Sequence, residues 1–589
     1  MKTILFSFIL VAVVWSQSQA QSYPFTLSAD LQATINLDPT SQETFNNLLL
    51  GTNTHDLAKS EGQEFVKSLD PITIRFPHGL FSNWYDWEQD KARLYGDEKI
   101  TYTKDDGMLR TVEVGMLSSI NTMDASNLYV GIDELNTLND EKKSATGKGY
   151  DMMWTFNMSA DGTDFDNGSP VSVARYNDLI KRGFEVKAIE MGNENFYPSQ
   201  RSSIIPNTSD YIARAKSIYN ALKALDPALK LSVPLERKSV PANTGWNTDL
   251  TKTTDYFDAV SVHTYVGYDP DDNSNSNEAY GVALTAREHL RKTIDDYSKV
   301  VAPDKPIWLT EWGVKSGGSN AVSALGMADC YIFMSENQDT YERANWFSVN
   351  GKLNSWVVWE TYFDVKANKE KERIKYPLQK TLFGSTYEII RSVFENSTLL
   401  KSSVDVPNLV DGVKAVNARV VLKDGKTSVI VVNLSNQEVP FNVNVRGAAY
   451  TGGFVHKTMA FSSMDEERAL GFDVDPLSLE KEGSGAITLP KLSVNTIELT
   501  DVGNVTSLRD RPSIANLVVS PNPNRGLFHI QLNENSQANY RLLSLSGSVV
   551  LSGSFFAKAE IRVDRYTAGI YLLEVTTDHS RSVHKLILD

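Results

Sequence analysis

Two glutamates carry the strongest chemical signal in this sequence. Glu194 follows the strand-like run of residues 186–191, and Glu311 ends the similar run of residues 307–311. Two carboxyl groups on separate strands that converge on one mouth can cleave a glycosidic bond. One must stay protonated to give its proton to the leaving oxygen, and the other must stay ionised to attack or shield the anomeric carbon. The pair therefore indicates glycoside hydrolysis.

The motifs around these glutamates strengthen that interpretation. Asn193-Glu194 and Thr310-Glu311-Trp312-Gly313 resemble the two catalytic motifs of clan A glycoside hydrolases, which are retaining enzymes on (β/α)8 barrels. The resemblance implies that Glu194, after the fourth strand, is the acid/base and that Glu311, at the end of the seventh, is the nucleophile. The chain between them is long enough for three β/α units.

A third segment, Ile74-Arg75-Phe76-Pro77-His78-Gly79, resembles the Arg-Phe-Pro-Gly-Gly segment of clan A arabinofuranosidases, with His78 in place of the first glycine. In that family the arginine lies beneath the nucleophile, where a buried cation would keep a carboxylate ionised. The resemblance gives this role to Arg75. The alternative is a structural arginine at the barrel floor. Because His78 departs from the family pattern, the shape of the sugar pocket stays open.

Two further side chains belong to Val262-His263-Thr264-Tyr265, at the end of the expected sixth strand. The resemblance implies that Tyr265 hydrogen-bonds Glu311 and that His263 contacts the acid/base or the substrate. An ordinary core histidine is the alternative for His263. Asn193 is expected to bind the sugar hydroxyl next to the anomeric carbon.

The remaining candidates for substrate binding follow expected strands or offer flat aromatic faces for sugar rings: Asn53, Glu134, Trp84 and Trp312. Ordinary core packing is the alternative for the tryptophans. Glu190 shares strand parity with Glu194, so it should point into the barrel and form a structural ion pair with Arg75. No metalloprotease, phosphate-loop or serine-hydrolase motif is present, and the acidic loops at 164–168 and 269–278 lack calcium-loop spacing. No cofactor or metal is expected.

The elements that must position these residues alternate between strand-like and helical patterns, which favours a parallel α/β fold. We predict a (β/α)8 TIM barrel over residues 45–385. Its helices include residues 209–225 and 278–300. Its strands are expected at residues 48–54, 72–76, 128–133, 186–191, 229–234, 259–264, 307–311 and 344–349.

The segments outside the predicted barrel have other sequence patterns. Residues 1–20 have the basic start, short apolar run and small residues of a secretory signal peptide, and no other stretch is long enough to span a membrane. Residues 386–500 are expected to form a β-sandwich, joined by a strand from the N-terminal segment 21–44.

A net charge of −15 argues against nucleic-acid or anionic-membrane partners. The single cysteine, Cys330, is expected to be a buried thiol.

A polar linker over residues 501–516 precedes a last unit, residues 517–589. This unit opens with Ser520-Pro521-Asn522-Pro523, carries Gly569-Ile570-Tyr571 and closes on Lys585-Leu586. It resembles the C-terminal sorting domain of the type IX secretion system of Bacteroidetes. The resemblance implies export by that machinery to the cell surface or the medium. An accessory carbohydrate-binding sandwich is the alternative.

Together these patterns predict a secreted or cell-surface retaining glycoside hydrolase that acts on plant or algal polysaccharide, with a small β-sandwich sorting domain at its end. Arabinofuranosidase, glucuronidase, agarase-like and β-glucanase-like specificities all stay open. The alternative from another class is a catalytically dead carbohydrate-binding protein or adhesin on the same barrel.

Overall fold

The computed structural model describes most of the 589-residue chain. The described residues are 22–54, 57–94, 98–104, 107–122, 128–158, 169–236, 245–266, 277–298, 300–314, 318–348, 359–365, 368–375, 377–500, 502, 514, 517–532, 536–544, 549–577 and 581–589. The predicted signal peptide, most of the predicted linker and most of both acidic loops lie outside them. The chain forms two compact units, residues 1–500 and 501–589.

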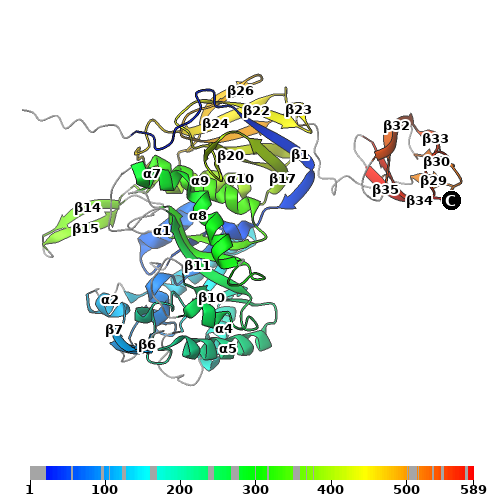
Figure 1. Ribbon diagram of the computed structural model, residues 1–589. Helices are drawn as coiled ribbons and strands as arrows, with labels where there is room; N and C mark the ends of the chain where they lie inside the picture. Colours follow the sequence, from blue (N-terminus) through cyan, green and yellow to red (C-terminus); the bar gives the residue numbers. More distant parts are fainter. Residues whose placement is uncertain are drawn as a thin grey trace, which may run out of the picture. The chain divides into compact units, whose positions relative to one another are not determined.

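The first unit contains a closed barrel of eight parallel strands in sequence order (Figure 1), which confirms the predicted TIM barrel. Strand β2 closes the barrel by pairing with both β3 and β13. The strands are β2 (Gly51–Asn53), β3 (Thr73–Phe76), β8 (Asp151–Phe156), β9 (Ala188–Met191), β10 (Lys230–Leu235), β11 (Ala259–Val266), β12 (Ile307–Val314) and β13 (Tyr341–Trp346).

The predicted third strand, residues 128–133, is wrong. Helix α3 (Ile132–Thr146) begins there, after Gly131 in the left-handed region at φ 93°. The barrel strand is β8, where Met152, Met153 and Trp154 are at most 1% exposed. A parallel strand covered on both faces has no polar alternation. Methionine is not enriched in strands, so the run gives a weak strand signal.

Helices surround the barrel and connect it to the second sheet. They are α1 (Ser60–Leu69), α2 (Met116–Thr122), α3, α4 (Ser169–Lys181), α5 (Thr208–Leu225), α6 (Trp246–Leu250), α7 (Asn277–Leu284), α8 (Ala286–Thr293), α9 (Ala321–Glu336) and α10 (Leu382–Phe394). Short turns are η1 (Asn47–Leu49), η2 (Gly79–Trp84), η4 (Pro198–Gln200) and η5 (Ile294–Ser298).

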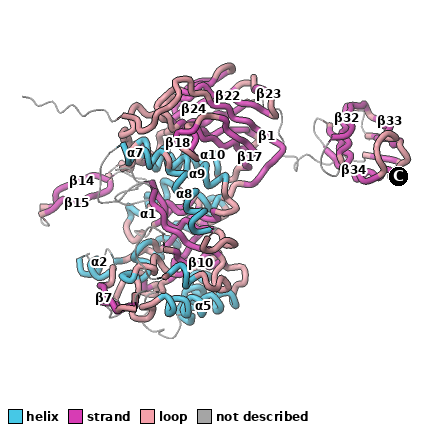
Figure 2. Tube along the Cα trace, viewed as in Figure 1, coloured by secondary structure: helices cyan, strands magenta, loops and turns pink. Residues whose placement is uncertain are grey.

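Helix α9 is buried on every side. Only Glu336 at its end is not buried, because α9 packs against β12 on one side and against the second sheet on the other (Figure 2). A helix that is apolar all round belongs in such a position. Cys330 lies within it as a buried free thiol, as predicted.

The second sheet has ten strands, nine of them in one continuous hydrogen-bonded path and the tenth, β27, paired with β22 beside that path, so the predicted sandwich is a half-barrel. Strand β1 (Ala33–Thr44) lies between β17 and β22, which confirms that an N-terminal strand joins this sheet. The other strands are β17 (Thr398–Asp405), β20 (Val416–Lys423), β21 (Lys426–Asn433), β22 (Val439–Val445), β23 (Ala448–Ala449), β24 (Phe454–Ala460), β26 (Ser478–Gly483), β27 (Ile487–Leu489) and β28 (Ser493–Leu499).

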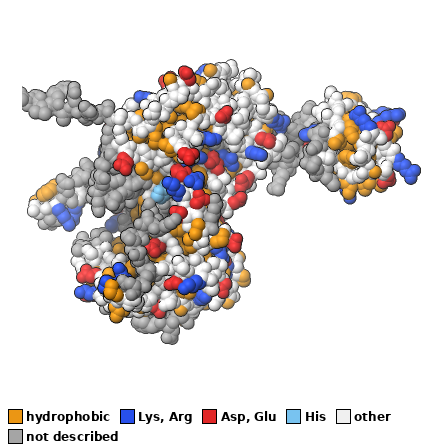
Figure 3. Space-filling view, viewed as in Figure 1, with side chains coloured by type: hydrophobic (Ala, Val, Ile, Leu, Met, Phe, Trp, Pro, Cys, Tyr) orange, Lys and Arg blue, Asp and Glu red, His pale blue; other side chains and the backbone are white. Residues whose placement is uncertain are grey.

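Five small two-stranded sheets complete the first unit. They are β4 (Tyr85–Asp86) with β5 (Lys91–Ala92), β6 (Lys99–Thr103) with β7 (Leu109–Glu113), β14 (Trp359–Asp364) with β15 (Lys369–Ile374), β16 (Gln379–Lys380) with β25 (Leu470–Gly471), and β18 (Asn408–Val410) with β19 (Val413–Lys414). On the face seen in Figure 3, acidic and basic side chains are interspersed, so the net charge of −15 forms no single patch there.

The second unit is a seven-stranded sheet with its own apolar core, which includes Phe528, Leu542, Leu573 and Leu586. Its strands are β29 (Val518–Ser520), β30 (Leu527–Gln531), β31 (Gln537–Leu543), β32 (Val549–Phe556), β33 (Lys558–Arg562), β34 (Gly569–Thr576) and β35 (Arg581–Leu588). Over the described part of the chain, every helix is too short or too polar to span a membrane.

Candidate active site

The turn after β9 aims Glu194 at the barrel mouth. Gly192 has φ 88°, and a Cβ there would lie 1.9 Å from Oδ1 of Asn195, so only glycine fits. Glu194 itself has φ 45°, a conformation that costs a non-glycine residue roughly 1–3 kcal/mol. The Tyr197 amide stabilises the turn by donating to the Glu194 carbonyl at 2.8 Å. Backbone strain of this kind is typical of functional residues.

Glu311 reaches the same mouth from β12. Strand β12 pairs with β11 so that Glu311 lies beside His263, after a register shift between Ser261 and His263. The Glu311 side chain is 7% exposed and that of Glu194 is 22% exposed. Both carboxylates are therefore largely removed from water.

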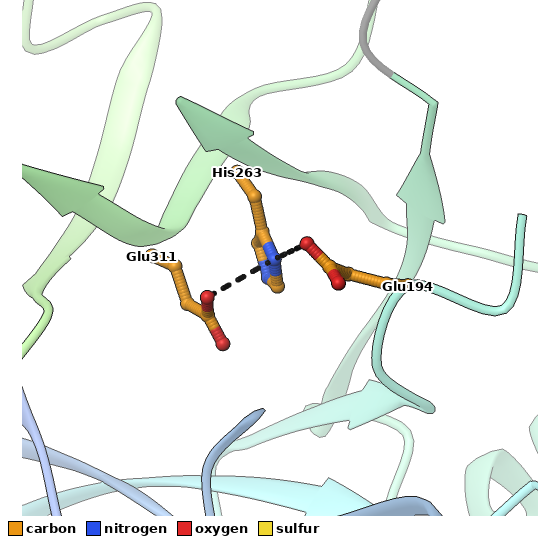
Figure 4. A group of neighbouring side chains, drawn as sticks. All are labelled: Glu194, His263 and Glu311. Atoms are coloured by element: carbon orange, nitrogen blue, oxygen red, sulfur yellow. Dashed lines mark hydrogen bonds and ion pairs between the residues drawn. The ribbon is translucent and has the colours of Figure 1, made fainter. Parts of the chain in front are cut away.

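His263 lies between the two glutamates (Figure 4). Its Nδ1 is 2.9 Å from Oε1 of Glu194 and 3.4 Å from Oε2 of Glu311. One oxygen of each carboxylate and one histidine nitrogen all lie within 4.8 Å of one another. The protonation of Glu194 and that of His263 are therefore linked, because each side chain appears among the causes of the other's pKa shift.

Arg75 forms the floor under Glu311. It is fully buried and donates to Oε1 of Glu311 at 2.9 Å, to Oε2 of Glu190 at 2.6 Å, to Asn53 at 3.0 Å and to Asn193 at 2.8 Å. The predicted Arg75–Glu190 pair and the place of Arg75 beneath Glu311 are confirmed as contacts. Burial lowers the pKa of Arg75, but the charges of Glu190 and Glu311 raise it by more, so the guanidinium stays charged.

Tyr265 fixes the other oxygen of Glu311. Its hydroxyl donates to Oε2 at 2.9 Å, as the family resemblance implied. Burial raises the pKa of Tyr265 well above its usual value, and the charge of Glu311 raises it further. The phenol therefore keeps its proton, and Glu311 is held between two donors, Tyr265 and Arg75.

Burial and neighbouring charges have opposite effects on the pKa values of Glu194 and His263. Burial raises the pKa of Glu194, but the hydrogen bond and charge of His263 and a hydrogen bond from Gln200 lower it by more. Burial lowers the pKa of His263, and the carboxylates Glu311 and Glu194 raise it by more. The proton of this pair therefore rests on the imidazole, 2.9 Å from the Glu194 oxygen that can receive it.

Glu194, His263 and Glu311 are also the type of residues that bind metals. Glu311 already accepts from the Arg75 guanidinium and the Tyr265 hydroxyl, and a cation at the same oxygens would meet the charge of Arg75. Such donors suit a carboxylate that is held ionised for attack. The donor set therefore fits acid–base and nucleophilic chemistry better than metal binding.

The walls around Glu311 are aromatic and close. Phe347 lies edge-on to His78, with ring centroids 4.9 Å apart, and to Tyr265 at 6.1 Å. A Cβ on Gly79 would lie 3.9 Å from Oε1 of Glu311. The segment with the unusual His78 therefore lies next to Glu311.

Burial contradicts three predicted substrate contacts, those of Asn53, Trp84 and Trp312. Asn53 is fully buried, and its amide donates to the backbone carbonyls of Thr310, Asn345 and Trp346. Glu134 lies in the first turn of α3, where the helix dipole stabilises a carboxylate. Asn53 therefore has a structural role, and the predicted substrate contact of Glu134 stays a prediction.

The two tryptophans belong to the core. Trp312 is fully buried and lies edge-on to Trp346 and Tyr331, because side chains alternate along β12 and Glu311 takes the inner face. Trp84 is 2% exposed and packs in a cluster with Ala92, Ile100, Val114 and Met116. Aromatic residues after barrel strands are as common in cores as in sugar sites.

Gln200 and Asn83 are parts of the site that the sequence patterns did not indicate. Gln200 donates to Oε2 of Glu194 at 2.6 Å, and Asn83 donates to Gln200 at 2.9 Å. Asn193 is 1% exposed, and its amide bonds Arg75 and Gln200. Asn193 therefore connects Arg75 to Gln200, and its predicted contact with a sugar hydroxyl stays a prediction.

Known protein structures share the architecture of the first unit. The first unit has the fold of clan A glycoside hydrolases, as in families 51 and 44. A family 51 α-L-arabinofuranosidase from Bifidobacterium longum is 16% identical with a TM-score of 0.55, covering 80% of this chain and 99% of that one. The family 51 α-L-arabinofuranosidase from Thermotoga petrophila is 15% identical with a TM-score of 0.57, covering 80% and 100%. A family 44 xyloglucanase from Paenibacillus polymyxa is 14% identical with a TM-score of 0.51, covering 80% and 99%.

The second unit is identified more closely. Residues 518–589 match the family model of the secretion system C-terminal sorting domain, which confirms the predicted type IX sorting domain. The protein is therefore secreted or held at the cell surface. No curated protein sequence matches this chain.

Proposed function

We propose that the first unit is a retaining glycoside hydrolase that cleaves plant or algal polysaccharide by double displacement. The observation that carries this proposal is that an oxygen of Glu194, an oxygen of Glu311 and a ring nitrogen of His263 all lie within 4.8 Å of one another. Retaining enzymes hold their carboxyl groups about 5–5.5 Å apart, and inverting ones about 6.5–9.5 Å apart to admit a water.

In this mechanism Glu311 attacks the anomeric carbon while Glu194 protonates the leaving oxygen. Arg75 and Tyr265 hold the two oxygens of Glu311 in place, and His263 supplies the proton to Glu194 when the sugar arrives. Glu194 then removes a proton from the water that releases the sugar from Glu311. No step needs a cofactor.

The two groups of neighbours suggest the range of substrates. The neighbours are α-L-arabinofuranosidases and a xyloglucanase, so aryl α-L-arabinofuranosides, aryl β-glucosides, arabinan and xyloglucan form the first substrate panel. Because the protein is exported, a polymer too large to enter the cell is the proposed physiological substrate.

Glu194→Ala tests the acid/base role. The variant should lose about 10²- to 10⁴-fold in turnover of natural substrates, while an activated aryl glycoside keeps a fast first step. Added azide should restore turnover, since it replaces the water that Glu194 can no longer activate. Initial rates by aryl release, with the anomer of the product followed by NMR, give the measurement.

The matched control is Glu141→Ala, which removes an exposed carboxylate on α3 that pairs with Lys67 and should leave rates within a few-fold of the wild type. Equal losses on aryl and natural substrates without azide rescue would exclude Glu194 as the acid/base. A wild-type protein that binds oligosaccharides but cleaves none would instead favour the carbohydrate-binding alternative.

A further inference from the structure

Gln200 holds the oxygen of Glu194 that faces away from His263. It lies at the end of η4, six residues after Glu194, and is 9% exposed. Its amide lies 2.6 Å from Oε2 of Glu194, while Oε1 of Glu194 faces Nδ1 of His263. The two oxygens of the same carboxyl group thus have chemically different partners.

Arg75 determines which way the amides point. A guanidinium has only donors, so the Asn193 atom at 2.8 Å from Arg75 must be its oxygen. The Asn193 nitrogen then donates to Oε1 of Gln200 at 2.8 Å, which leaves the Gln200 nitrogen to face Glu194. The polarity of this chain of side chains therefore follows from one permanent cation.

Asn83 fixes the same orientation independently. Its oxygen accepts from the backbone N–H of Asn193 at 3.0 Å, and that N–H can only donate. The Asn83 nitrogen must then be the atom at 2.9 Å from Oε1 of Gln200. Two separate donors therefore meet the Gln200 oxygen, and both place the Gln200 N–H against Oε2 of Glu194.

An oxygen that accepts a short N–H bond is a poor place for a proton. When Glu194 is protonated, a proton on Oε2 would point at the Gln200 N–H and two donors would oppose each other. The proton therefore sits on Oε1, the oxygen that lies 2.9 Å from His263 and within the cluster with Glu311. This is the oxygen that can serve a leaving group over Glu311.

We propose that Gln200 is a positioning residue for the reaction, which selects Oε1 of Glu194 as the oxygen that delivers and receives the catalytic proton. The inference rests on the proposed function, since it gives a role to Gln200 only if Glu194 is the acid/base. Gln200 also completes a hydrogen-bonded chain from Glu194 through Asn193 and Arg75 to Glu311.

Gln200→Met in the full-length protein tests the role, because methionine is similar in shape but donates no hydrogen bond. Glycosylation of substrates with poor leaving groups should slow by roughly 10- to 100-fold, part of the 10²- to 10⁴-fold attributed to general acid catalysis. Activated aryl substrates should change by less than about 3-fold in kcat/KM. The alkaline limb of the kcat/KM profile should move to higher pH, because loss of a donor to the carboxylate raises the pKa of Glu194.

Gln200→Glu supplies a second, different signature. The introduced carboxyl group can still donate to Glu194 while it is protonated, so activity should approach the wild type at low pH. As that carboxyl group ionises, its negative charge raises the pKa of Glu194, so the alkaline limb of the kcat/KM profile should lie at higher pH than in the wild type and in Gln200→Met. The control is Gln63→Met, which removes a half-buried amide that donates to the Leu57 carbonyl at 3.0 Å in α1, away from the site.

The outcomes separate the two proposals. If the wild type is inactive on the whole panel, or if Glu194→Ala shows no azide rescue, the proposed function fails. If the wild type is active and rescue works, but Gln200→Met slows all substrates equally with an unmoved pH profile, Gln200 is only structural. If Gln200→Met does not fold, a Gln200→Glu profile that matches the wild type overturns the inference by itself.

Discussion

The site brings three carboxylates and up to two cations into a space with little water. The carboxylates are Glu190, Glu194 and Glu311, and the cationic side chains are Arg75 and His263. The arrangement is stable because each carboxylate has a cationic neighbour: Glu190 and Glu311 share Arg75, and Glu194 has His263. The Nε2 atom of His263 also lies 3.9 Å from Oε1 of Glu190, which favours the imidazolium. Removing one partner from such a group leaves the others uncompensated and is strongly destabilising.

His263→Asn should therefore show a pH-dependent loss of stability. The pKa of His263 is raised on folding, so its contribution is complete below about 6.5 and is lost as pH rises through the raised value. The pKa of Glu194 is lowered, so its contribution is complete above about 4.3 and is lost as pH falls through the lowered value. The difference from the wild type should be largest between about pH 4.3 and 6.5.

Urea unfolding of both proteins at a series of pH values measures this difference. Its maximum should be of the order of 3–5 kcal/mol, the usual effect of breaking a buried pair. A difference that does not vary with pH would mean that the imidazole is neutral and contributes only by packing.

At the same scale, the site residues with a sequence motif were predicted and those without one were missed. The contacts of Arg75 with Glu190 and of Tyr265 with Glu311 follow from strand parity and family resemblance. Gln200 and Asn83 lie on short turns, η4 and η2, whose conformations no periodic pattern encodes. The wrong assignments of Trp84 and Trp312 came from residue type alone, which does not distinguish a core from a sugar site.

Single elements set the geometry of this site. Strand β9 ends in a glycine-dependent turn, and η4 follows within the same short segment, so that Gln200 lies within hydrogen-bond distance of Glu194. Seven of the eight barrel strands lie at or near the predicted runs. The third barrel strand was predicted at the short apolar run before α3, which has the pattern of a strand. The actual strand, β8, was missed because its run contains two methionines. Periodicity alone cannot separate such short apolar segments.

Strand β1 shows how strongly one element can couple distant parts of the chain. It pairs antiparallel with β17 and parallel with β22, so the second sheet is continuous only through it. Ala33, Ile35 and Leu37 are at most 2% exposed, and the residues between them face outward or are half-buried. The N-terminal segment is thus an internal part of the sheet.

Ile35→Ala should lower the free energy of unfolding of the first unit by about 2–5 kcal/mol, because it leaves a cavity in the middle of the sheet. Asn36→Ala, at the neighbouring exposed position, should change it by no more than about 0.5 kcal/mol. Urea unfolding followed by tryptophan fluorescence gives both values. Equal, small effects of the two substitutions would mean that β1 is dispensable for the core.

At the scale of the whole molecule, the candidate active site and the sorting domain belong to different units. All residues of the candidate site lie in residues 1–500, whereas residues 518–589 match the sorting domain and form a sheet with a separate apolar core. Each unit therefore has what an independently folding domain needs. Catalysis and export should then be separable by cutting the chain between Thr500 and Leu517.

A protein truncated to residues 21–510 should fold and keep the glycosidase activity of the full chain within a few-fold when it is made in the cytoplasm. The same truncation in the native host should abolish appearance of the protein outside the cell, because the signal read by the secretion machinery is gone. Rates on the aryl glycoside panel test the first expectation, and immunoblots of cell and medium fractions test the second.

The control is the full-length Glu194→Ala variant, which should be exported normally while inactive. An inactive but folded truncate would assign the second unit a part in catalysis. Export of the truncate at wild-type levels would instead show that the route out of the cell is read elsewhere in the chain.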